Sequence, residues 1–250
     1  MPPAVPLSAP TLSIVMPALD EEAGIDRAID AAIEVFDALV ACGTIACGEV
    51  VVVDDGSRDA TAERVACRGV ADPRVRLVRH ERNRGLGGAV RSGLAAATGD
   101  LVLYTDADLP FDLTELHEAL RLMRVDHADV VSAYRRHRTG EGALRLVYSY
   151  LYNLLVRSAL GLHVRDVNFA GKLLSRAVVD DLELRSEGSF IDAELMARAE
   201  RRGYAIVQFG VDYFPRTRGV STLSSPRVIA EILHELRLLR PAIRATRPPR

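Results

Sequence analysis

Two aspartates one residue apart follow an apolar run near the middle of the chain, in the segment Tyr104-Thr105-Asp106-Ala107-Asp108. Side chains in a strand repeat their direction every two residues, so Asp106 and Asp108 at a strand end can point to the same side. Two carboxylates there repel each other unless a cation lies nearby, and hard divalent cations prefer oxygen ligands and bridge phosphates. We therefore predict that Asp106 and Asp108 hold Mg²⁺ or Mn²⁺. A solvated acidic turn is the alternative interpretation, because short matches of this kind are common by chance.

A second acidic pair lies in Val53-Asp54-Asp55-Gly56-Ser57, directly after a β-branched run. Asp and Gly form turns, and Ser or Asp can cap a following helix, so turn formation alone accounts for the pattern. The functional interpretation is that Asp54 or Asp55 accepts a hydrogen bond from a nucleobase ring N–H.

The segment Asn83-Arg84-Gly85-Leu86-Gly87-Gly88 resembles a dinucleotide-binding glycine loop only superficially. Its third glycine is misplaced, it follows the third predicted strand instead of the first, and the chain has no Walker-type lysine. A nicotinamide site is therefore not predicted. Small residues here would let a helix N-terminus approach a phosphate or sugar, or would allow close packing of a helix on a sheet.

Arginines gather in the second half of the chain, at Arg135, Arg136, Arg138 and Arg145. Guanidinium groups suit an anionic acceptor, although arginine runs on loops are often simply solvated. Asp192 and Glu194 flank the predicted acceptor side. Either carboxylate would act as a base there, or would cap or brace a helix.

The elements that must position these residues alternate between strands and helices. Strands are predicted at 11–18, 49–54, 75–79 and 101–105, with a helical segment after each of the first three. Such alternation favours a parallel, doubly wound sheet, in which ligands lie at the carboxyl ends of the strands. The acidic residues Asp20, Asp54, Asp55, Asp106 and Asp108 fall at those ends.

The second half of the chain is less regular. Helices are predicted at 112–125, 144–160, 192–202 and 226–239, and strands at 129–133 and 204–213. No internal repeat and no linker separates the halves. We therefore predict a single domain over residues 11–240, with a disordered tail at 1–10 and a polar tail at 241–250.

Composition excludes several classes of protein. The hydrophobic fraction of 48% excludes a disordered chain, and a net charge of −2 gives no basic field for nucleic acid. The cysteines Cys42, Cys47 and Cys67 form no CxxC pair, so no zinc site is predicted. Their odd number, the absence of a secretory signal and the absence of an apolar run of about eighteen residues indicate a cytoplasmic protein. Lys172 is the only lysine, which we interpret as genome composition.

Taken together, four ordered segments resemble family 2 glycosyltransferases with the GT-A fold, and most closely the polyprenyl-phosphate (dolichyl-phosphate) mannose and glucose synthases. The segments are Val15 to Glu21, Val53 to Ser57, Asn83 to Gly93, and Asp106 to Asp108. In the later half, Ser149 and Asn153 match the family's Ser-x-x-x-Asn helix, with Arg145 one turn earlier. Phe190 to Leu195 and Arg216-x-x-Gly219-x-Ser221 match two further family segments.

The resemblance implies an α/β, Rossmann-like fold with a mostly parallel sheet flanked by helices, and it implies roles for particular residues. Asp20, Glu21 and Asp54 or Asp55 would bind the nucleoside, and Asp106 and Asp108 would hold Mg²⁺ or Mn²⁺ against the diphosphate. Arg216 and Ser221 would close over the phosphates. Further contacts to the nucleotide sugar would come from Pro17, Asn83, Gly87 and Ala107. The catalytic candidates are Asp108, Arg145, Asp192 and Glu194, and the acceptor-binding candidates are Arg135, Arg145 and Ser149.

Three positions depart from the family pattern. Pro110 stands where many synthases carry Gln near the metal, which leaves the third metal ligand open. Asn168-Phe169-Ala170-Gly171 replaces the usual Thr-Ser-Gly-Phe, and Thr222 replaces a frequent Lys. The membrane helices that many relatives append are absent.

The implied activity is inverting transfer of a hexose from a UDP- or GDP-sugar to a polyprenyl monophosphate, at or near the inner face of the membrane. One alternative is transfer to a soluble hydroxyl acceptor such as a secondary metabolite, and another is non-catalytic binding of a sugar nucleotide. A nucleotidyltransferase would carry a glycine-rich, basic loop after the first strand, and Pro17 to Glu21 is not such a loop.

Overall fold

The computed structural model describes residues 9–136, 143–214 and 226–247, and in the first turns of two helices it describes only the backbone. Seven strands form one sheet: β1 Leu12–Ala18, β2 Gly48–Asp54, β3 Val75–Arg79, β4 Leu101–Thr105, β5 Val130–Arg135, β6 Gly171–Ser175 and β7 Ile206–Val211. The helices are α1 Ile25–Ala41, α2 Thr61–Ala71, α3 Gly85–Ala96, α4 Leu116–Val125, α5 Ala143–Leu160, α6 Arg176–Asp181, α7 Ile191–Arg202 and α8 Pro226–Ala245, with a short 3₁₀ helix at Leu113–Glu115.

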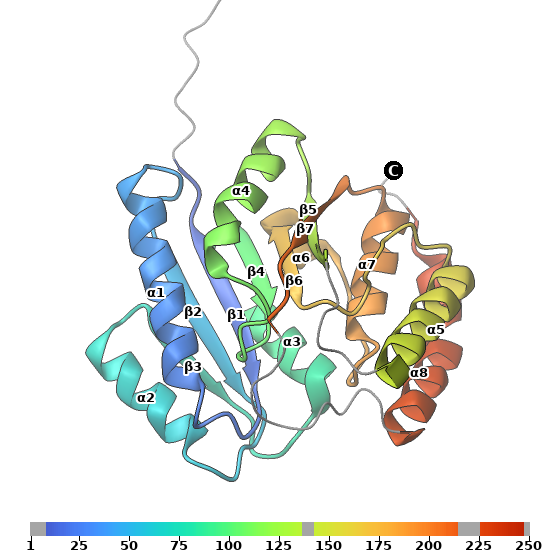
Figure 1. Ribbon diagram of the computed structural model, residues 1–250, viewed down its shortest axis with the longest axis horizontal. Helices are drawn as coiled ribbons and strands as arrows, with labels where there is room; N and C mark the ends of the chain where they lie inside the picture. Colours follow the sequence, from blue (N-terminus) through green and yellow to red (C-terminus); the bar gives the residue numbers. More distant parts are fainter. Residues whose placement is uncertain (1–8, 137–142, 215–225, 248–250) are drawn as a thin grey trace, which may run out of the picture.

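The sheet has the strand order β3-β2-β1-β4-β6-β5-β7 (Figure 1). β3, β2, β1 and β4 are parallel, which confirms the predicted doubly wound arrangement of the first half. The β-branched run Val50 to Val53 is fully buried, as a strand covered on both faces should be. In register, Ala18 lies opposite Asp54, so β1 and β2 end side by side.

β6 is absent from the sequence prediction, and it is the one antiparallel strand of the sheet. It pairs with β4 on one side and with β5 on the other, and Gly171 lies opposite Thr105. β6 therefore starts at the edge where β4 and β5 end. The segment that precedes it, residues 166–170, lies at the carboxyl edge with the acidic turns of the first half.

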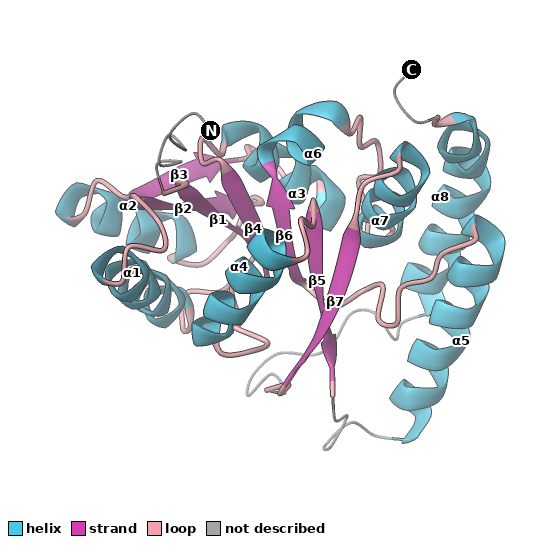
Figure 2. Cartoon of the chain, turned by 90° about the horizontal axis from the view of Figure 1, so that it is seen from above, coloured by secondary structure: helices cyan, strands magenta, loops and turns pink. Residues whose placement is uncertain are grey.

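Helices cover both faces of the sheet (Figure 2). One apolar core packs α1, α2 and α4 against side chains such as Ile14, Val52 and Leu103. The other packs α3, α5, α6, α7 and α8 against side chains such as Val15, Val53 and Leu174. One continuous sheet thus carries both halves of the chain, as a single α/β fold.

The end of α8 and the direction of the side chains after β4 differ from the sequence prediction. α8 continues through Pro241 to Ala245, beyond Leu239, so the stretch from residue 241 begins as helix and not as a tail. Leu236 and Ile243 lie seven residues apart on its buried side, and burying Ile243 offsets the backbone hydrogen bond that proline cannot make. β4 ends at Thr105, so Asp106-Ala107-Asp108 forms a turn. Its side chains are directed by that turn and not by strand alternation.

Candidate functional site

Polar residues follow four adjacent parallel strands at one edge of the sheet. Asp20 follows β1, Asp55 follows β2, His80 follows β3 and Asp106 follows β4. Because the strand order is β3-β2-β1-β4, these groups form a continuous row. The carboxyl edge is the usual ligand site of such sheets.

Asp54 and Asp55 point to opposite faces of the sheet and are both buried. Asp54 Oδ1 accepts a hydrogen bond from Ser57 N at 3.3 Å, whereas its Oδ2 is buried without a hydrogen-bond donor and lies 3.6 Å from Arg79 Nε. Asp55 Oδ1 accepts from Arg84 N at 2.8 Å and faces His80 Nδ1 at 2.6 Å. Each carboxylate thus has one oxygen engaged by the protein.

The loop after β1 is tied to the loop after β2. Asp20 adopts a left-handed backbone conformation with φ of 54°, and its N–H donates to Ser57 Oγ at 3.0 Å. Its Oδ1 accepts from Arg58 N at 2.8 Å, and Glu21 N donates to Thr61 Oγ1 at 2.9 Å. Hydrogen bonds therefore hold together the two loops that carry the predicted nucleoside-binding residues. Pro17 lies within β1, opposite Val53.

Asp106 and Asp108 flank a tight turn at the end of β4. Leu109 N donates to Asp106 O at 3.2 Å, and Leu109 has a φ of 54°. Ala107, predicted to contact the donor, has its side chain in the apolar core. Among the described residues no group of three or more His, Cys, Asp or Glu could hold a metal ion. Two carboxylates still fit Mg²⁺ or Mn²⁺, because these ions in nucleotide sites take one or two carboxylates and complete their shells with phosphate oxygens and water.

The glycine-rich start of α3 packs against the segment that precedes α7. Gly85 N donates a hydrogen bond to Asn83 Oδ1 at 2.8 Å, and Gly87 N donates to Glu187 O at 2.9 Å. A Cβ on Gly87 would lie 2.3 Å from Ser186 O. The backbone of Ser186 and Glu187 thus occupies the space beside Gly87 in which a phosphate or sugar was predicted. Close packing of a helix on the sheet, the other interpretation of these glycines, is seen at Gly93 of α3. A Cβ there would lie 2.2 Å from Val15 Cγ1 of β1.

Arg135 ends β5 and is engaged within the protein. Its Nε and Nη2 donate to the two oxygens of Asp166 at 2.7 and 3.0 Å, and its side chain is 10% exposed. The guanidinium carbon lies 5.7 Å from the Phe169 ring centroid and 5.2 Å from that of Tyr213. This predicted acceptor-binding arginine thus joins β5, β7 and the segment before β6.

The sole lysine forms a fully buried ion pair with Asp192. Lys172 Nζ lies 2.5 Å from Asp192 Oδ1 and donates to Phe169 O at 2.7 Å. Burial raises the pKa of Asp192, although Lys172 acts in the opposite direction. Asp192, a predicted catalytic residue, therefore links α7 to the segment 166–170.

Glu194 is fully buried and braces the chain before α7. Its Oε2 accepts from Arg185 N and Ser186 N at 2.8 and 2.7 Å, and its Oε1 accepts from Arg198 Nε at 2.8 Å. Of the two interpretations that the sequence leaves open for Glu194, these contacts favour bracing over chemistry.

Several predicted residues lie outside the described part. Arg216, Ser221 and Arg138 belong to segments that are not described, and the side chains of Arg145 and Ser149 are not described although both residues lie in α5.

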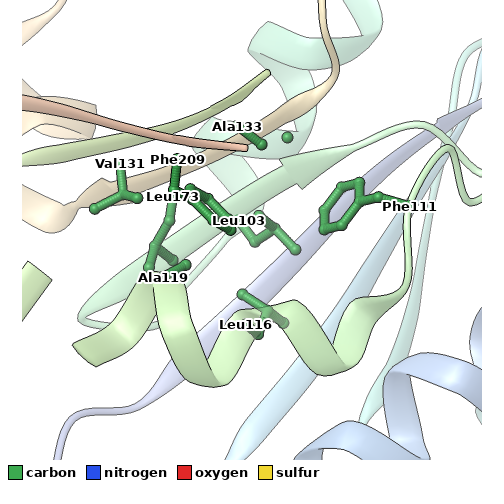
Figure 3. Close-up of a pocket in the computed structure, with 9 residues that line it drawn as sticks. Leu103, Phe111, Leu116, Ala119, Val131, Ala133, Leu173 and Phe209 are labelled. Atoms are coloured by element: carbon green, nitrogen blue, oxygen red, sulfur yellow. The ribbon is translucent and has the colours of Figure 1, made fainter. Parts of the chain in front are cut away.

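A small apolar pocket lies between α4 and the sheet (Figure 3), lined by side chains that include Leu103, Phe111, Leu116 and Phe209. Its lining side chains carry no charge and no hydrogen-bonding group. It belongs to the core and is no site for a nucleotide.

Sequence reasoning missed His80 and misjudged Lys172. His80 is buried between Asp55 and Ser92, and no local motif marks it. Lys172 did carry a signal, because it is a charged residue in an otherwise apolar strand and the single lysine of an arginine-rich chain.

Comparison with known proteins agrees with this geometry. The model of Glycosyl transferase family 2 matches residues 13–183, and the chain belongs to that family. Glycosyltransferase AglD of Haloferax volcanii is 31% identical over 212 residues, which cover 82% of this chain and 33% of the relative. The dolichyl-phosphate beta-glucosyltransferase of Mus musculus is 29% identical over 217 residues, covering 81% and 67% of the two chains. The chain thus spans between one third and about two thirds of these relatives.

Among solved structures, glucosyl-3-phosphoglycerate synthase from Mycobacterium tuberculosis, in complex with Mn²⁺ and UDP-glucose, matches with a TM-score of 0.68 and 27% identity. The match covers 91% of this chain and 79% of that protein. The fold is therefore the GT-A fold that the sequence motifs predict.

Proposed function

We propose that this chain transfers a hexose, with inversion, from a UDP- or GDP-sugar to a polyprenyl (dolichyl-type) monophosphate. The observation that carries the proposal is the row of carboxylates on β1, β2 and β4 at one edge of a GT-A sheet. Support for the acceptor comes from relatives named dolichyl-phosphate beta-glucosyltransferase, which match over about four fifths of the chain.

The donor would lie along that edge. Asp54 or Asp55 would accept a hydrogen bond from the nucleobase, and Asp106 and Asp108 would hold Mg²⁺ or Mn²⁺ at the diphosphate. The bound ion would neutralise negative charge on the leaving diphosphate. Mn²⁺ and UDP-glucose occur together in the structurally similar synthase, which supports this use of the carboxylates.

The acceptor needs no strong base. A phosphate monoester has a second pKa of about 6 and is mostly dianionic at neutral pH, so its oxygen can attack the anomeric carbon directly. Arg145 would contribute positive charge for this anion. Arg135, which is paired with Asp166, would fix the position of the segment 166–170 on the acceptor side of the carboxyl edge. Asp192, paired with Lys172, would serve the same purpose.

A soluble acceptor is the second candidate. The similar synthase has also been solved in complex with phosphoglyceric acid, at 27% identity to this chain. With a small phosphorylated or hydroxyl-bearing acceptor, the donor would still bind at the carboxylates that follow β1, β2 and β4. Only the acceptor that approaches the donor would differ.

The two candidates are separated by one transfer assay. Radiolabelled UDP-glucose or GDP-mannose is incubated with Mn²⁺, the protein, and either dolichyl phosphate in detergent or phosphoglyceric acid. Our proposal expects label in the organic phase with dolichyl phosphate. Label on phosphoglyceric acid alone would favour the soluble acceptor, and no transfer with any donor would leave non-catalytic binding.

The proposal also includes contact with an anionic membrane surface at the cytoplasmic face. No helix among the described residues is long and apolar enough to cross a bilayer. α5 and α8 lie side by side at one end of the molecule (Figure 2). They expose apolar side chains together with arginines, namely Leu154, Leu155, Arg157, Leu233, Arg237, Leu238 and Arg244. Such a mixture suits an interface between lipid headgroups and acyl chains.

A further inference from the structure

His80 connects three elements of the donor half. It directly follows β3, it is 9% exposed, and its backbone N–H donates to Asp54 O at 2.9 Å. Its ring lies between Asp55 of the β2 end and Ser92 of α3, with Nδ1 2.6 Å from Asp55 Oδ1 and Nε2 2.9 Å from Ser92 Oγ. Aspartate, histidine and serine thus form a chain that leads away from the carboxyl edge into the protein.

The chemistry of these groups fixes the histidine tautomer. An ionised carboxylate only accepts hydrogen bonds, so Nδ1 must carry the proton that faces Asp55. In the neutral ring Nε2 is then an acceptor, and the Ser92 hydroxyl can rotate to donate to it. Ser92 therefore favours the tautomer that donates to Asp55.

The effect on Asp55 is to fix one oxygen and leave the other to a ligand. Oδ1 receives both His80 Nδ1 and Arg84 N, whereas no described residue donates a hydrogen bond to Oδ2. Two donors on one oxygen define the plane of the carboxylate. The free direction of Oδ2 is thereby set before any ligand arrives, which reduces the entropy lost on binding.

We propose that His80 is a positioning residue for the donor nucleoside, acting through Asp55 while Ser92 holds its tautomer. The inference rests on the proposed function, because it assumes that the Asp54–Asp55 turn receives the nucleoside of a sugar donor. A purely structural histidine would contribute to stability whichever ring nitrogen was used. A positioning histidine needs the nitrogen that faces Asp55.

Two substitutions separate the nitrogens. In His80→Asn the amide N–H₂ occupies the place of Nδ1 and can still donate to Asp55, whereas the contact to Ser92 is lost. In His80→Gln the amide reaches the place of Nε2, and the contact to Asp55 is lost. Ser92→Ala removes the outer partner alone. His163→Ala is the matched control, since His163 also faces a carboxylate, Glu200, but its side chain is 88% exposed and it lies before β6, far along the chain from the donor loops.

The Kd values of UDP and GDP with Mn²⁺ are measured by calorimetry for each variant, beside its melting temperature. His80→Gln is expected to weaken the nucleotide that the wild type binds by about tenfold or more, the effect of losing a hydrogen bond to a charged group. His80→Asn and Ser92→Ala are expected to stay within about threefold of wild type, because the bond to Asp55 persists. His163→Ala should match wild type. The donor KM should follow the Kd, with kcat little changed.

The pattern of outcomes is decisive in each case. Weakening by His80→Gln alone supports the inference, even when both His80 variants melt at similarly lower temperatures. Equal weakening by both variants, or none by either, overturns it while leaving the proposed function intact. A wild-type protein that binds neither nucleotide overturns the inference and the proposed function together.

Discussion

Asp20, Asp54 and Asp55, three of the aspartates at the carboxyl edge, each accept a hydrogen bond from the protein's own backbone. Asp20 binds Arg58 N, Asp54 binds Ser57 N, and Asp55 binds Arg84 N. The residues that we propose for nucleotide binding therefore also hold the turns in place. The two interpretations that the sequence leaves open for the Asp54–Asp55 turn are compatible for Asp55, because its Oδ1 accepts from Arg84 N and no described residue donates to its Oδ2, whereas Oδ2 of Asp54 is buried.

Asp108→Ala is expected to abolish transfer and leave the fold intact. Asp108 is half-buried in the turn after β4, so its truncation takes away a proposed metal ligand without removing an apolar side chain from the core. Turnover and circular dichroism are compared with those of wild type, in Mn²⁺ and in excess EDTA. Wild-type turnover that persists in EDTA would contradict the role of the metal.

Asp192→Asn is expected to destabilise the fold but to retain substantial turnover per folded molecule. Losing the partner of the buried Lys172 ammonium typically costs about 3–5 kcal/mol. The free energy of unfolding is measured in urea, and turnover with dolichyl phosphate is measured at a temperature where the variant is folded. Arg145→Ala, in contrast, should lose acceptor binding.

The opposite order would identify a general base. Loss of a base lowers kcat by about 10²–10⁴-fold. Such a loss in folded Asp192→Asn, with Arg145→Ala unaffected, would mean that the acceptor is a hydroxyl group.

The sequence predicts where the acidic residues lie, because strand ends follow from hydrophobic pattern and turn chemistry. It does not predict His80, Asp166 or Lys172 as partners. Those contacts join residues 20 to 31 positions apart, on different elements, and only the fold brings them together.

At the scale of elements, α3 and the segment before α7 depend on each other. Glu187 O accepts from Gly87 N, and Glu235 of α8 holds the same segment through Glu187 N and Gly188 N at 3.0 and 3.1 Å. The glycines allow this contact because a side chain would occupy the place of backbone atoms.

Gly87→Ala is expected to lower the free energy of unfolding by about 1–3 kcal/mol, the usual cost of overpacking. The new Cβ would lie 2.3 Å from Ser186 O, and backbone must move to relieve the clash. Gly24→Ala is the control, since the nearest atom to its Cβ is Glu21 Oε2 at 4.0 Å. Equal urea midpoints for the two variants would show that the approach of the two segments is not tight.

Glu49→Gln tests the opposite edge of the sheet. Burial raises the pKa of Glu49, but hydrogen bonds from Ser13, Arg76 and Thr98 outweigh this effect and lower the pKa from 4.5 to about 2. A carboxyl with a lowered pKa stabilises the fold above its unfolded pKa and loses that contribution as pH falls. The variant should therefore be less stable by about 1.5–3 kcal/mol near pH 7, and the difference should shrink between pH 4.5 and 2.

The control for this pH dependence is Glu118→Gln. Glu118 pairs with Arg121 on the exposed surface of α4, where ion pairs contribute little to stability. A stability difference for Glu49→Gln that stays constant down to pH 2 would show that its carboxylate is not the stabilising group.

The strands of the first half match their predicted ranges within a residue or two, because β-branched runs and glycine turns mark them strongly. β6 and α6 escape prediction for a physical reason. β6 is five residues long and contains a glycine and a lysine, and its stability comes from pairing with β4 and β5 on both sides. The local sequence does not indicate which distant strands will pair with it.

At the scale of the whole molecule, the polar residues that we propose for donor binding and the α5–α8 helix pair lie in different parts of the fold. The polar residues proposed for donor binding follow β3, β2, β1 and β4, whereas α5 and α8 lie on the side of α7 (Figure 1). A lipid surface on the helices and a nucleotide on the strands would therefore not compete for the same face.

Sedimentation with liposomes tests the membrane contact. The protein should pellet with vesicles that contain anionic lipid at low salt and should be released as salt rises, because screening weakens attraction between arginine and headgroup. A double variant, Leu233→Ser with Leu238→Ser, should pellet less, and Val70→Ser on α2 is the exposed apolar control. No sedimentation at any salt concentration would leave a soluble acceptor or a recruiting partner.

The position of the only lysine, Lys172, in a central strand has a practical consequence for following the opening of this fold. A lysine-specific protease has a single possible cleavage site in these 250 residues, and that site lies in a strand paired on both sides. Cutting requires β6 to leave the sheet, so the appearance of two fragments would report the separation of β6 from β4 and β5. The rate of cleavage at Lys172 would therefore measure how fast β6, the strand between β4 and β5, leaves the sheet.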